Sequence, residues 1–291
     1  MEHFKSPFDA RDFAPARVVE NQVFFENMLD RAREHRFFSH PFLSAADSRV
    51  GSREFVSFML TSIYKLVSPF TSLLCSLGSR APNLRSRFAL MDNIYEEMGR
   101  GELREAHPSL YLAMLASVGV SEDAAESMPT PASIRRINAH LREVVENRPF
   151  AVGCAVLAAA ELIIPACFPA FIALTQQAFS NVDMTFFDRH GPRDEGHSDD
   201  AAMLFAMTAD QVDYAVVDAE VKLHLDYRSE LFDEWMQLMN ARALPAVRSE
   251  RPRAISERPR SISERPRAIS ERPRSISVRP VHRPSAAPPA G

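Results

Sequence analysis

Apolar residues recur at helical spacing along most of the first 240 positions, whereas the strict alternation typical of strands is nearly absent. Such stripes predict helices, each ended by a glycine, a proline or a polar stretch. We expect residues 121–131 to be a connection, and Pro69 to kink the helix that contains it. The expected helices cover residues 21–37, 53–77, 82–98, 107–115, 133–146, 150–179, 198–207 and 209–240.

The composition supports an all-α fold. Only 9 of the 291 residues are glycine, and alanine, leucine and methionine are plentiful, as in helical proteins. A chain of this length can bury a substantial core. Its three cysteines lie in apolar runs and form no CxxC pair, which indicates buried thiols in a reducing compartment. Residues 1–17 contain no apolar signal-peptide core, so we expect a cytoplasmic protein.

Charge divides the chain into two regions. The formal net charge is −4, but residues 245–291 carry eleven arginines and four glutamates, so residues 1–244 carry the remaining −11. A folded region this acidic is not expected to bind nucleic acid. Residues 245–291 repeat a seven-residue Ser-Glu-Arg-Pro-Arg-(Ala/Ser)-Ile unit, and a proline in each copy excludes a coiled coil. We therefore expect one domain over residues 1–244, followed by a disordered, cationic repeat tail over residues 245–291.

His190, Asp194 and His197 are spaced by four and then three residues. On a single helix this spacing would place all three side chains on one face. Two imidazoles and a carboxylate suit a transition metal such as Fe(II) or Zn(II). The alternative is a solvated, charged helix start, because arginines and further aspartates crowd the same stretch.

Pro192 complicates that arrangement. Proline disfavours helical geometry at the preceding residue, Gly191, and would strain a helix interior. If Pro192 instead stands in a first helical turn, His190 falls outside the regular helix. We therefore expect Asp194 and His197 to be helical and His190 to be the loosest of the three.

Glu161 is the only charged residue in the apolar stretch 150–179. The stretch is long enough to span a membrane. Glu161 near its centre, together with Pro165 and Pro169, argues against a span, and a buried core helix fits better. A carboxylate on such a helix needs a cation or a proton to offset its desolvation.

Three further residues are candidates for the same chemistry. Glu97 ends one predicted helix and His107 opens the next, with a glycine-containing loop between them that can bring the two together. The alternatives are an exposed acid and a helix cap. Lys65 is the only charge after Glu54 in the helix 53–77; it either reaches the surface or holds a substrate carboxylate.

Taken in order, Tyr95-Glu-Glu-Met-Gly-Arg-Gly, His107-Pro, Glu161 and His190-x3-Asp194-x2-His197 resemble the haem-oxygenase-like diiron oxidases. The resemblance covers roughly residues 24–240. It implies an all-α, seven-helix haem-oxygenase-like bundle without haem, which binds two Fe(2+) ions per chain and uses O2 as co-substrate. It implies no catalytic residue beyond the iron ligands. The implied ligands are Glu97, His107, Glu161, His190, Asp194 and His197.

The resemblance implies an O2-dependent oxidase or oxygenase of specialised metabolism, acting on a small amino-acid-like or carboxylate substrate. The reaction would be C–H or C–C oxidation, desaturation or N-oxidation; N-oxidation is less favoured because residues 55–77 lack the extra acid of some N-oxygenases. One alternative is an alkene-forming fatty-acid decarboxylase, and another is a non-catalytic bundle that binds a ligand or partner. Expected partners are the small-molecule substrate, an external electron donor and a second copy in a homodimer, with no nucleic acid and no membrane.

Overall fold

Helices form all the regular structure in the part of the chain that the computed structural model describes, residues 15–48, 51–190 and 195–240. These residues belong to the first of the chain's two units, Met1–Pro252 and Arg253–Gly291, and only that unit is described here. The α-helices are α1 (Ala16–Arg33), α2 (Ala45–Ser48), α3 (Arg53–Val67), α4 (Phe70–Ser79), α5 (Leu84–Glu97), α6 (His107–Ser117), α7 (Glu122–Ser127), α8 (Ala132–Asn147), α9 (Phe150–Leu162), α10 (Ile164–Ala178), α11 (Thr185–His190), α12 (Glu195–Thr208) and α13 (Tyr214–Asn240). Short 3-10 turns join them at η2 (Arg36–Ser39), η3 (Pro41–Ser44), η4 (Gly99–Gly101), η5 (Leu103–Glu105) and η6 (Gln211–Asp213).

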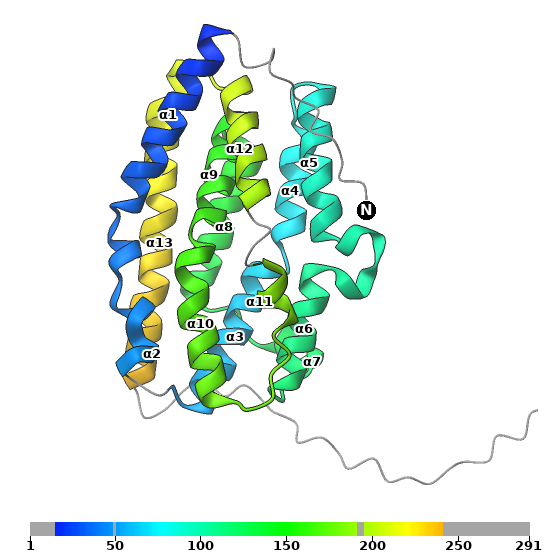
Figure 1. The fold of residues 1–291 in the computed structure, drawn as a ribbon, viewed down its shortest axis with the longest axis vertical. Helices are drawn as coiled ribbons and strands as arrows, with labels where there is room; N and C mark the ends of the chain where they lie inside the picture. Colours follow the sequence, from blue (N-terminus) through cyan, green and yellow to red (C-terminus); the bar gives the residue numbers. More distant parts are fainter. Residues whose placement is uncertain (1–14, 49–50, 191–194, 241–291) are drawn as a thin grey trace, which may run out of the picture. The chain divides into compact units, whose positions relative to one another are not determined.

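Several pairs of helices are stacked end to end in the helical domain, and the breaks between the two helices of each pair lie at a similar height. In Figure 1, α4 stands above α3, α9 above α10, and α12 above α11. The first break lies at Pro69, which has no backbone N–H to continue the ladder of α3. The second lies at Ile163, just before Pro165 in the first turn of α10. These breaks matter because the cavity described below is lined by residues next to them.

The core is centred on α9, where eleven consecutive residues, Ala151–Glu161, are buried. This helix packs against α12, α13 and α8. It lies close to α4, because a Cβ atom added at Gly153 would come within 2.6 Å of Leu77 Cδ1. The glycine therefore leaves room for the Leu77 side chain between α9 and α4.

Hydrogen bonds of a buried polar side chain connect α1 to the turn between α12 and α13. The Asn21 amide donates to the backbone oxygens of Ala206 (2.7 Å) and Ala209 (2.9 Å), and its own oxygen accepts from the Tyr214 hydroxyl (2.6 Å). These bonds satisfy carbonyl groups at the end of α12 that the helix itself leaves open.

The all-α prediction is confirmed, with differences in detail. The segment expected over residues 53–77 is two helices, α3 and α4, because Pro69 ends one rather than only bending it. The segment over 150–179 is likewise divided into α9 and α10, and the expected connection 121–131 contains the short helix α7. The repeat tail lies outside the described residues, so its predicted disorder stays a prediction.

Two helical segments are long and apolar enough to cross a membrane by length and composition, Arg53–Ser79 and Phe150–Ala178. In the second, 78% of the most apolar window is buried inside the body, and in the first 50%. The expectation of a core helix around Glu161 agrees with this packing, since α9 is covered by other helices of the chain.

Candidate metal centre and its cavity

Glu97 is the last residue of α5 and His107 the first of α6, and the loop between them brings their side chains into contact. His107 Nδ1 lies 2.9 Å from Glu97 Oε2, with 13% and 9% of the two side chains exposed. The loop can turn this tightly because Gly99, Arg100 and Gly101 all adopt positive φ, a region that costs little only for glycine. An imidazole and a carboxylate thus meet at one edge of the core.

The end of α11 lies beside the same loop. Arg189 Nη2 donates to Glu105 Oε2 at 2.7 Å, two residues before His107. Within α11, the Phe186 ring meets the Tyr111 ring edge-on at 4.6 Å and the His107 ring at 6.4 Å between centroids. These contacts bring the backbone of α11, which ends at His190, next to the Glu97–His107 pair.

Glu161 is the penultimate residue of α9 and is 8% exposed. It borders the same cavity as Glu97 and His107. On its other side it borders a smaller cavity, about 10 Å³, that is also lined by Asn93 of α5 and Asp200 of α12. The carboxylate therefore lies on α9 at a place where α12 packs against both α9 and α5.

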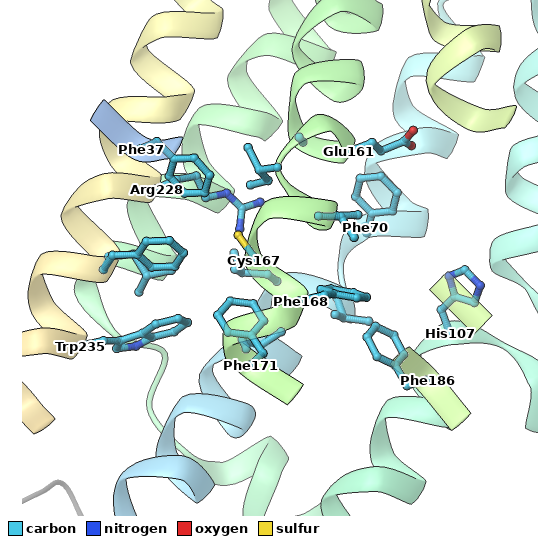
Figure 2. Close-up of a pocket in the computed structure, with 18 of the residues that line it drawn as sticks. Phe37, Phe70, His107, Glu161, Cys167, Phe168, Phe171, Phe186, Arg228 and Trp235 are labelled. Atoms are coloured by element: carbon cyan, nitrogen blue, oxygen red, sulfur yellow. The ribbon is translucent and has the colours of Figure 1, made fainter. Parts of the chain in front are cut away.

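The larger cavity has a volume of about 140 Å³ and a mainly apolar wall. Figure 2 shows His107 and Glu161 on one side of it, aromatic rings along its length, and Arg228 and Trp235 on the opposite side. The lining residues come from η2, α3, α4, α5, α6, α9, α10, α11 and α13. The apolar wall is formed by Phe37, Ile63, Leu66, Val67, Phe70, Ala160, Ile163, Ile164, Cys167, Phe168, Phe171, Phe186, Leu231, Phe232 and Trp235.

Sequence analysis did not identify Arg228, which reaches this cavity from α13. Its Nε donates to His224 Nε2 at 3.3 Å. Burial lowers the pKa of its guanidinium to about 10 and raises the pKa of the neighbouring Cys167 thiol to about 12. At neutral pH the arginine is therefore charged and the cysteine is not.

Three of the six predicted ligands, Glu97, His107 and Glu161, border one cavity. His190 is the last residue of α11 and His197 lies in the first turn of α12, while Asp194 lies outside the described residues. The described residues thus assign His190 to α11 and His197 to α12. The Pro192 argument, which set His190 apart from the helix of His197, agrees with these bounds.

Lys65 lies elsewhere in the body. Its Nζ donates to the backbone oxygen of Glu126 in α7 at 2.9 Å, and the Tyr64 hydroxyl donates to Oε1 of the same glutamate at 2.5 Å. Lys65 is not among the residues that line the cavity. The surface role weighed for it matches these contacts better than a role in holding substrate.

Iron suits these residues in ligand type. Glu97, His107 and Glu161 offer two carboxylates and an imidazole in a largely apolar setting, the mixture that Fe(II) accepts in proteins. Among the described side chains, no three of histidine, cysteine, aspartate or glutamate are close enough together to hold a metal ion by themselves. The other predicted ligands lie in the 190–197 stretch, whose side chains are outside the described set.

The fold and this arrangement define an all-α, haem-oxygenase-like protein with buried carboxylate and histidine side chains at one end of an apolar cavity. The chain belongs to the family of iron-containing redox enzymes, whose family model matches residues 58–225. No curated protein sequence matches it.

Solved structures with the same fold are distant in sequence. A TenA homologue from Pseudomonas syringae is 16% identical, with a TM-score of 0.58 over 82% of this chain and 99% of that one. A domain of unknown function with a heme oxygenase-like fold from Shewanella denitrificans is 16% identical, with a TM-score of 0.59 over 77% and 95%. A CADD-like protein of unknown function from Nostoc punctiforme is 13% identical, with a TM-score of 0.62 over 73% and 97%. At these identities the likeness concerns the fold alone.

Proposed function

We propose that this protein is a cytoplasmic, non-haem diiron oxidase or oxygenase that uses O2 to oxidise a small amino-acid-like or carboxylate substrate in specialised metabolism. The observation that carries the proposal is the contact between Glu97 and His107 at the wall of an apolar cavity that Glu161 also borders. Membership of the iron-containing redox enzymes supports the metal. The proposed ligands are these three residues with His190, Asp194 and His197.

In this proposal the candidate ligands, the aromatic rings and the volume of the cavity each have a separate role. Glu97, His107 and Glu161 hold the iron pair, which supplies the reduction of O2 and the oxidising power for the substrate. The aromatic rings of Phe168, Phe171 and neighbouring residues exclude water, so that the substrate rather than solvent is oxidised. The narrow volume keeps a bound molecule in contact with both ends of the cavity.

The number of electrons needed to reduce O2 shows that this reaction requires an external electron donor. Full reduction of O2 to water takes four electrons, and removal of two hydrogens from the substrate supplies two of them. An external electron donor therefore supplies the other two in each turnover. A homodimer remains part of the proposal, tested by the mass of the protein in solution.

Anaerobic titration with Fe(II), followed by mixing with O2, tests the proposal directly. We expect two Fe(II) ions bound per chain, and a transient visible absorption after O2 is added. A chain that binds no iron would instead be a non-catalytic bundle, and iron bound without any O2-dependent absorption change would rule out the oxidase.

The variant Glu161→Gln tests whether the Glu161 carboxylate is an iron ligand together with Glu97 and His107. Glutamine keeps the volume but removes the negative charge, so we expect about one iron per chain instead of two, and no O2-dependent absorption, in a folded protein. Iron content by metal analysis and helicity by circular dichroism measure both effects. Full iron loading and O2 reactivity in this variant would remove Glu161 from the site.

Glu220→Gln is the matched control, because Glu220 is also 8% exposed but lies away from the cavity. It pairs with Arg148 at 2.8 Å and with His140 at 3.6 Å. We expect this variant to lose about 1–3 kcal/mol of stability from the broken pair while keeping its iron.

A further inference from the structure

Arg228 is a cation inside the helical body without an anionic partner among the described residues. Its Nε donates to His224 Nε2 at 3.3 Å, and this is the only hydrogen bond found for its side chain among the described residues. Part of the side chain is accessible, and this side chain lines the cavity. The two unoccupied donors of a guanidinium fork match the geometry of a carboxylate.

The neighbours of Arg228 do not neutralise its charge. Burial raises the pKa of Cys167 to about 12, so its sulfur, near the guanidinium in Figure 2, stays a neutral thiol. The pKa of His224 lies well below its ordinary value, because burial and the nearby Arg228 disfavour the charged form. A partly buried charge without a counter-ion costs stability, which favours a role for this arginine in binding an anionic ligand.

We propose that Arg228 binds the carboxylate of a small, apolar monocarboxylate substrate that lies along the cavity with its opposite end at Glu97, His107 and Glu161. The inference rests on the proposed function, because it names that enzyme's substrate class and the orientation in which it is held. In Figure 2 the arginine and His107 stand on opposite sides of the cavity, with the rings of Phe168 and Phe70 between them.

Charge and size limit the ligand. Arg228 is the only lysine or arginine among the described residues that line the cavity, so it balances one negative charge rather than the nearly two of a phosphate ester. The volume of about 140 Å³ is close to that of the roughly 150 Å³ cavity known to accept benzene. A carboxylate with a body of benzene size fits these limits.

The orientation has a chemical consequence. If the carboxylate is held by Arg228, the carbon that reaches the metal end is remote from the carboxyl group. Oxidation there leaves the carboxyl carbon in place, which distinguishes this arrangement from decarboxylation. His224 is a positioning residue in this scheme, because it accepts from Nε and leaves the two Nη atoms to face the ligand.

Binding can be measured through Trp235, which is the only tryptophan in the chain and lines the cavity. The probes are phenylacetate and its uncharged analogue phenylacetamide, titrated into the full chain with and without Fe(II) in the absence of O2. We expect phenylacetate to bind about tenfold or more tightly than phenylacetamide in both states, as for a hydrogen bond to a charged group. Equal affinity for the two probes overturns the proposal.

Arg228→Met removes the charge at similar volume, and Arg136→Met is its control, because Arg136 is exposed and pairs with Glu230 on the surface. We expect Arg228→Met to lose the preference for phenylacetate and Arg136→Met to keep it. A preference that survives in Arg228→Met, or that requires Fe(II), would place the carboxylate on the metal and overturn the inference. If Arg228→Met does not fold, Arg228→Lys must weaken phenylacetate binding several-fold, since it keeps the charge but loses the fork.

Orientation is tested by paramagnetic relaxation of the bound probe's protons in Fe(II)-loaded protein. The para ring proton should relax faster than the methylene protons next to the carboxylate, and the reverse order contradicts the proposal. The two proposals can fail separately. A chain that binds no iron defeats the diiron enzyme, while the preference for phenylacetate over phenylacetamide in the metal-free protein still decides whether Arg228 is an anion site.

Discussion

At the scale of single residues, the histidines differ in what their ring nitrogens contact. His35 and His40 each accept a backbone N–H at Nδ1 and face an aspartate of α13 through Nε2, at 3.1 Å in both cases. These two stabilise the turns η2 and η3 against α13. His140 and His224 lie buried with their rings 5.9 Å apart, and His107 borders the cavity. Of these five histidines, only His107 is a candidate metal ligand.

Stability should fall in mild acid because of His224. Its pKa is lowered by burial and by the charges of Arg228 and His140, so below pH 6.5 the unfolded chain binds a proton that the folded chain does not. Stability therefore decreases as the pH falls through about 6.5 and below, because protons bind preferentially to the unfolded chain. His140, whose pKa burial lowers even beside Glu220, adds a loss in the same direction.

The variant His224→Gln keeps an acceptor for Arg228 but cannot be protonated. Urea unfolding of both proteins between pH 8 and pH 5.5 should give a shallower pH dependence for the variant. Their difference at pH 8 reports packing alone, since the histidine is neutral there in both states. Parallel curves across the whole range would contradict the assignment.

At the scale of elements, the loop from Gly99 to Glu105 determines whether Glu97 and His107 meet. Two glycines in it have positive φ, but their surroundings differ. A Cβ atom at Gly99 would lie 2.4 Å from the backbone nitrogen of Ala106, whereas at Gly101 it would meet nothing within 4 Å. The backbone closely approaches itself only at Gly99.

We expect Gly99→Ala to open this loop and weaken iron binding, because a backbone atom cannot move aside as a flexible side chain can. Gly101→Ala should lose about 1–2 kcal/mol of stability from the unfavourable φ alone and keep its iron. Fe(II) titration and thermal unfolding of the two variants separate these effects. Equal iron affinities in the two variants would show that the close approach at Gly99 does not matter for the site.

At the scale of the whole molecule, an acidic region of −11 precedes a repeat tail of +7. The tail's prolines and charges leave it without the apolar residues that a packed core requires. We predict that removing residues 245–291 leaves helicity per folded residue and iron content unchanged, and shifts the melting temperature by no more than about 2 °C. A larger loss of melting temperature would show that the tail packs on the helical body.

Most of the fold could be predicted from the sequence, because the formation of a helix depends mainly on residues that are close together in the sequence. Apolar stripes and capping residues predicted most helices to within a few positions, including the one that ends at Glu97 and the one that begins at His107. The breaks between paired helices were harder to predict. Whether Pro69 or Pro165 bends a helix or ends it depends on what packs beside it, and that information is not local.

The sequence by itself determined the all-α class, the acidic region and its tail, and the singular position of Glu161, since one carboxylate in an apolar helix is conspicuous wherever that helix packs. Only the tertiary structure decided which basic residue faces the cavity. Arg228 lies in α13 among Lys222, Asp226 and Glu230, and its local pattern is that of a solvated helix. Its place beside Cys167 arises because α13 packs across the broken columns of α9 and α10, a contact between residues far apart in the chain.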